Sequence, residues 1–61
     1  MKRSEFIRYL QKHHCILHRE GSNHTIIVNL RSKKQSTLGR HQEISNLLCK
    51  KICKQLGIPE I

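Results

Sequence analysis

The apolar positions of this chain follow a helical period at both ends and a strand-like pattern in the middle. Near the N-terminus, large side chains recur at spacings of three and four residues, the period of an amphipathic helix. Ser4 is a suitable N-cap and Glu5 suits a first helical turn. The recurring positions are Phe6, Tyr9, Leu10 and His13. This pattern predicts a helix over residues 5–13.

The middle of the chain favours three strands. Residues 15–19 form a short β-compatible run, residues 20–23 are turn formers, and residues 24–30 are rich in β-branched side chains. Two such runs joined by a short glycine-containing loop predict a hairpin. A basic loop over residues 31–34 is followed by a weaker third strand, 35–38.

The last element is predicted to be a second helix. Ser45 or Asn46 is expected to cap it, Gly57 to end it, and Pro59 does not fit a continuing helix. Its apolar positions recur at helical spacing at Cys49, Ile52, Cys53 and Leu56. We therefore expect one α+β domain spanning residues 1–61. Its order is α-β-β-β-α, with a three-stranded antiparallel sheet and both helices on one face.

Size and charge restrict what such a domain can do. A chain of 61 residues has room for one layer of sheet and helices on one side, not for a deep substrate cavity. Twelve Lys and Arg against four acidic residues give a net charge of +8. This excess favours nucleic acid or an acidic protein as the partner. With no apolar stretch near 20 residues and no signal-peptide core after Met1-Lys2-Arg3, we expect a cytoplasmic protein that does not bind membranes.

The three cysteines do not indicate a metal or disulfide site. Their number is odd and no CxxC spacing occurs. Cys49 and Cys53 lie four apart, so with a histidine they would resemble a partial zinc site, but a free cysteine usually behaves as a small buried hydrophobe. We therefore expect neither a metal nor a small-molecule cofactor.

His24 is the leading candidate for chemistry. It follows a Gly21-Ser22-Asn23 turn and opens the apolar run that begins at Ile26. An imidazole titrates near neutral pH, and this position places it at the start of a rigid strand. Strand alternation puts His24 on the same face as Ile26 and Val28, but three consecutive β-branched residues leave open which face packs on the helices.

Three segments resemble the HicA toxins, small messenger-RNA interferases of bacterial toxin–antitoxin pairs. Residues 21–27 resemble their glycine-then-histidine strand, residues 40–44 the segment before their second helix, and residues 50–58 their closing helix. The resemblance implies a double-stranded-RNA-binding-domain-like fold, ribosome-independent cleavage of mRNA, and inhibition by a HicB-type antitoxin. It implies a single catalytic histidine, which falls on His24. Since no metal site is expected, we expect this cleavage to be metal-independent.

Cleavage of RNA by its own 2′-hydroxyl needs a base, an acid and positive charge around the reacting phosphate. We expect His24 to serve as base, acid or both in turn, with His18 as a further candidate acid. The residues expected to contact RNA are Arg19, Ser22, Lys33, Lys34, Arg40 and His41. Few aromatic side chains occur, so recognition through phosphate and 2′-hydroxyl groups is expected rather than base stacking.

Two other functions fit the same sequence. One is an RNA-binding module of the same fold without catalysis, in which His24 is structural. The other is a protein whose basic face docks on an acidic protein partner. Loss of cleavage on replacing His24 separates the nuclease from the first alternative, and strong salt dependence of RNA binding argues against the second.

Overall fold

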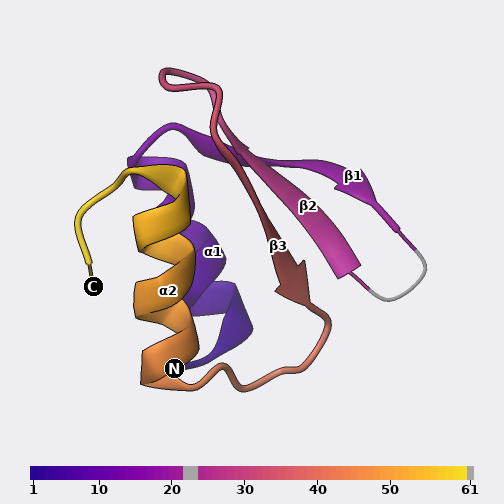
Figure 1. Cartoon of the computed structure of the whole chain (residues 1–61). Helices are drawn as coiled ribbons and strands as arrows, with labels where there is room; N and C mark the ends of the chain where they lie inside the picture. Colours follow the sequence, from indigo (N-terminus) through magenta and orange to yellow (C-terminus); the bar gives the residue numbers. More distant parts are fainter. Residues whose placement is uncertain (22–23, 61) are drawn as a thin grey trace.

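The computed structural model describes residues 1–21 and 24–60. The elements are α1 (Arg3–Lys12), β1 (Cys15–Glu20), β2 (His24–Asn29), β3 (Gln35–Gly39) and α2 (Asn46–Leu56). The strands form one antiparallel sheet in the order β1-β2-β3. Both helices lie against the same face of that sheet (Figure 1). The predicted α-β-β-β-α architecture is confirmed.

Alternation along β2 decides which face of the sheet meets the helices. Thr25, Ile27 and Asn29 are buried, whereas His24 is exposed and the residues between are half-buried. The buried set joins side chains from both helices in one core, and all three cysteines belong to it. Its members are Phe6, Leu10, Cys15, Ile27, Leu38, Ile44, Cys49, Ile52, Cys53 and Leu56. Burial raises the pKa of the Cys15 and Cys49 thiols, which keeps them protonated and chemically inert.

The start of α1 differs from the prediction. Ser4 was expected to be the N-cap, but the helix begins at Arg3 with Lys2 in the cap position. The chain before the helix is held by a distant segment, because the Arg3 N–H donates to the Gln42 carbonyl at 2.7 Å and Lys2 bridges to Glu43. This tertiary contact satisfies one free N–H of the first turn, and no side-chain cap is present at this end of the helix.

The ends of α2 follow the sequence signals. The Ser45 hydroxyl accepts a hydrogen bond from the Leu48 N–H at 3.2 Å, as an N-cap should. Gly57 ends the helix in the left-handed conformation with φ of 72°, which glycine adopts without steric cost. Both predicted signals are confirmed. Among the described residues, no helix combines the length and hydropathy needed to cross a bilayer.

Asn29 ties the end of β2 to the end of α2. Its amide nitrogen donates to the Leu56 carbonyl at 2.8 Å, and its side-chain oxygen accepts from the Arg31 and Ser32 N–H groups. The side chain is buried, and the contact joins residues 27 positions apart. One polar side chain therefore shapes the basic loop and fixes the second helix on the sheet.

We expect Asn29→Ala to lower the free energy of unfolding by about 2–3 kcal/mol, because it leaves a buried carbonyl and two N–H groups without this partner. Urea denaturation measures the change, with Gln35→Ala, an exposed strand residue, as the control. A loss below about 0.5 kcal/mol would show that water replaces the amide at this site.

Candidate functional site

His24 lies on the open face of the sheet, opposite the helices. It is the first residue of β2 and its side chain is exposed. The Gly21 N–H donates to the His24 carbonyl at 2.7 Å, which closes the β1–β2 hairpin directly beside the imidazole. The sequence left open whether the sheet face that carries His24 packs on the helices or meets solvent. In the structure this face meets solvent, so a polymeric ligand has access to it.

Cross-strand pairing places a cation and a hydroxyl near His24. The register pairs Ile26 with Arg19 of β1 and with Thr37 of β3. Paired residues share a face, so both lie on the open face as diagonal neighbours of His24, about 7–8 Å away in such ladders. On β1 this depends on a bulge between Leu17 and Arg19, which shifts the register and turns Arg19 to the open face.

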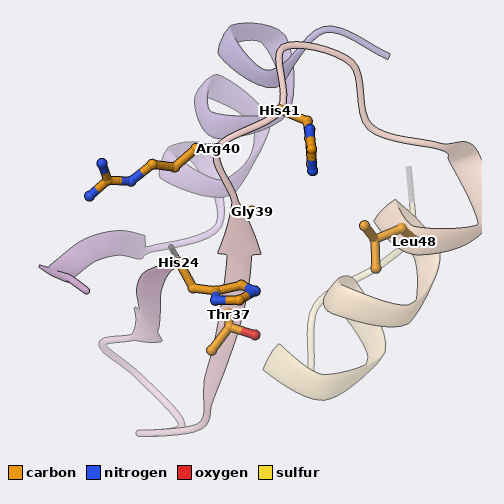
Figure 2. A pocket seen from close by; sticks show the side chains of 6 residues that line it. All are labelled: His24, Thr37, Gly39, Arg40, His41 and Leu48. Carbon is orange, nitrogen blue, oxygen red and sulfur yellow. The ribbon is translucent and has the colours of Figure 1, made fainter. Parts of the chain in front are cut away.

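An open pocket of about 620 Å³ lies at this end of the sheet. It is lined by residues of β2, β3, the following loop and α2, namely His24, Thr37, Gly39, Arg40, His41 and Leu48. In Figure 2 the rings of His24 and His41 face the same space, whereas the Arg40 guanidinium points away from it. Three of the candidates from sequence, His24, Arg40 and His41, are thus brought together here.

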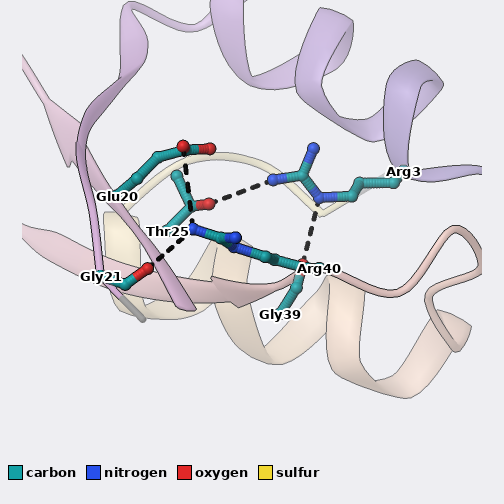
Figure 3. Close-up of polar contacts among 6 residues, drawn as sticks. All are labelled: Arg3, Glu20, Gly21, Thr25, Gly39 and Arg40. Carbon is teal, nitrogen blue, oxygen red and sulfur yellow. Dashed lines mark hydrogen bonds and ion pairs between the residues drawn. The ribbon is translucent and has the colours of Figure 1, made fainter. Parts of the chain in front are cut away.

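Two arginines donate hydrogen bonds to backbone carbonyls at the strand ends next to the pocket. The Arg3 guanidinium donates to the Gly39 carbonyl at 3.1 Å and to the Thr25 hydroxyl at 3.2 Å. Arg40 donates to the Gly21 carbonyl at 2.7 Å and forms an ion pair with Glu20 at 3.8 Å (Figure 3). In this structure Arg40 therefore connects the end of β3 to the β1–β2 hairpin.

The other candidates lie apart from the pocket. Lys33 and Lys34 occupy the loop beyond Asn29, at the opposite end of β2, about 17 Å from His24 by the rise of a strand. His18 lies at the β1 bulge, outside the ladder pairs. Ser22 lies outside the described residues.

Sequence reasoning did not identify Thr37, Leu48 or Arg3 as site residues. Thr37 sits in a weak strand whose register is visible only in the folded sheet, and Leu48 reaches the pocket from a helix 24 positions after His24. Arg3 acts through contacts to residues 22 and 36 positions away. No local pattern marks any of the three.

The arrangement suits proton transfer at an anionic group on an open surface. Two imidazoles, a side-chain type that often serves as general acid or base, and one hydroxyl line the pocket, and the register places Arg19 diagonally from His24 on β1. Within residues 1–21 and 24–60, no three His, Cys, Asp or Glu side chains gather closely enough to hold a metal ion.

Comparison with known proteins agrees with the resemblance seen in the sequence. The family described as the HicA toxin of bacterial toxin–antitoxin systems matches residues 3–58, nearly the whole chain. Searches of curated proteins and of solved structures gave no significant match. The matched region runs from the first residue of α1 to just beyond Gly57, so it includes every element that positions the pocket. The chain therefore belongs to the HicA family, whose members are the toxins of bacterial toxin–antitoxin pairs.

Proposed function

We propose that this toxin is a metal-independent endoribonuclease that cleaves mRNA without the ribosome, acts in the cytoplasm and uses His24 for proton transfer. The observation that supports this most is the position of His24, exposed at a strand end and beside Arg19 and Thr37. A histidine kept for structure would more commonly be buried with a hydrogen-bond partner. The α-β-β-β-α fold also leaves one face of its sheet uncovered by helices, so that face is accessible to RNA (Figure 1).

The reaction is an attack by the RNA 2′-hydroxyl on the adjacent phosphorus. The 2′-oxygen loses its proton and bonds to phosphorus, the bond to the 5′-oxygen breaks, and that oxygen takes up a proton. The products are a 2′,3′-cyclic phosphate and a 5′-hydroxyl. The His24 imidazole takes part in these proton transfers, and the Arg19 cation stabilises the extra negative charge of the transition state.

The remaining basic residues extend the RNA path beyond the pocket. A strand bound at His24 and running along β2 passes Arg19 and reaches Lys33 and Lys34 at the far end. Arg40 and His41, which line the pocket, belong to the near end of this path. Phosphate contacts of this kind hold the RNA in register and carry little sequence information.

Binding should weaken steeply with salt, and Arg19 should account for part of that dependence. With single-stranded RNA and His24→Ala protein, which leaves the RNA uncut, we expect Arg19→Ala to reduce the slope of log affinity against log salt by about 0.7. Arg8→Ala, an exposed arginine on α1, is the matched control and should leave the slope unchanged. Filter binding between 50 and 200 mM salt, about the range where such effects are large, measures it. Equal slopes for both variants would place the RNA elsewhere.

Inhibition is expected to come from an antitoxin of the HicB type that covers the RNA surface. The toxin has a net charge of +8, so an acidic protein is attracted to the same face as RNA. Leu48, which lines the pocket, is 42% exposed and its chain neighbour Leu47 is 80% exposed, and exposed apolar side chains of this kind suit a protein interface. We therefore expect the antitoxin to inhibit cleavage by covering the surface that RNA would otherwise contact.

The test of this function is cleavage of RNA by purified protein with EDTA present. Cut RNA ending in a 2′,3′-cyclic phosphate supports the nuclease. Binding without cleavage would identify the protein as an RNA-binding module instead, and the absence of both would favour an acidic protein as its sole ligand.

A further inference from the structure

A second imidazole shares the pocket of His24. His41 lies in the loop after β3, and its ring faces the same space as the His24 ring from the other side (Figure 2). Both side chains are exposed, so a phosphate entering this open pocket meets both.

Gly39 is the residue of β3 that lies between the two histidines. The register pairs Gly39 directly with His24, and Cβ positions of such pairs lie about 4.5–5.5 Å apart. A Cβ atom on Gly39 would lie 3.5 Å from the His41 Cδ2 atom. The His41 ring therefore lies next to Gly39, the residue directly opposite His24. A residue larger than glycine at position 39 would place its side chain against the His41 ring. Arg3 fixes this point by its hydrogen bond to the Gly39 carbonyl.

Resting on the proposed nuclease function, we propose that His41 is the second proton-transfer group of the reaction, paired with His24. One imidazole takes the proton from the 2′-hydroxyl as the oxygen–phosphorus bond forms. The other gives a proton to the 5′-oxygen as its bond to phosphorus breaks. One proton is taken and one is given, so the pair ends the step with its protonation states exchanged and solvent restores them.

The other residues that line the pocket do not fit this role. A guanidinium does not act as a proton-transfer group, and that of Arg40 is bound to the Gly21 carbonyl and to Glu20. Thr37 supplies a hydroxyl, which donates hydrogen bonds without changing charge near neutral pH. Among the six lining residues, His24 and His41 are the two that carry an imidazole, the side chain that most often serves as general acid or base.

The test uses an RNA in which sulfur replaces the bridging 5′-oxygen at a mapped cleavage site, because a thiolate leaves without an acid. His24→Ala and His41→Ala should each lose about 100-fold or more in rate on ordinary RNA. On the sulfur-containing RNA, the variant that lacks the acid should return close to the wild-type rate, and the variant that lacks the base should not. The recovered variant identifies the acid.

His41→Lys separates proton transfer from simple attraction of phosphate. Lysine keeps the positive charge but releases its proton less readily, so this variant should behave like His41→Ala. Circular dichroism and thermal unfolding check that each variant is folded. A wild-type rate for His41→Ala or His41→Lys, or failure of both alanine variants to recover on the sulfur-containing RNA, would overturn the pair. A wild-type protein that leaves RNA intact would instead overturn the nuclease function itself.

Discussion

Replacing His24 with alanine is expected to abolish RNA cleavage and leave the fold intact. A positioned acid or base contributes about 10²–10⁴-fold in rate, so the loss should reach that range. The side chain is exposed at the start of β2, and substitutions at such positions change stability by about 0.5 kcal/mol or less. Induced expression in bacteria should therefore arrest growth and degrade RNA for the wild type, and do neither for His24→Ala.

The matched control is His18→Ala, which removes another exposed histidine from the neighbouring strand. This variant should keep full toxicity, because His18 lies at the bulge and outside the pocket. Purified His24→Ala with a wild-type melting temperature and undiminished cleavage would rule out the proposed role of His24. Toxicity of both variants without RNA loss would point to a protein target.

Local signals in the sequence were sufficient for the elements of this fold. The pairing of β1 with β2 as a hairpin, the Ser45 cap and the Gly57 stop depend on neighbours within a few positions, so they could be predicted. The start of α1 could not, since it depends on the contact between Arg3 and Gln42, 39 positions along the chain. Helix starts of this kind depend on tertiary structure.

The site was predictable only in part for the same reason. A turn followed by His24 is a local pattern, and it identified the residue. Its face was undecided because Ile26, Ile27 and Val28 are all apolar, although Ile27 alone is fully buried. The approach of His41 depends on Gly39 lying opposite His24 and on a register that no local pattern sets. Lys33 and Lys34 were expected to contact RNA and follow His24 by nine and ten positions, and the strand carries them to its other end.

The pocket also depends on the core, so Phe6→Ala should remove activity by a different route. Phe6 is fully buried among residues of both helices and the sheet. Truncating a buried phenylalanine costs about 3–5 kcal/mol. A domain of this size has about 3–9 kcal/mol of stability in total. We expect the variant to be partly or wholly unfolded at 37 °C, with a lower urea midpoint and no toxicity.

The consequence for the site follows from the position of Phe6 one turn after Arg3 on α1. Phe6 anchors the helix that lets Arg3 reach the Gly39 carbonyl and the Thr25 hydroxyl, so loosening the helix releases both strand ends. Phe6→Leu keeps the site apolar and most of its volume, and should therefore cost less than about 1.5 kcal/mol and retain cleavage. His24→Ala is inactive but folded, whereas Phe6→Ala should be inactive because it is not folded, and urea denaturation distinguishes them. A Phe6→Ala protein as stable as the wild type would show that the core repacks around the gap and that Arg3 does not depend on this anchor.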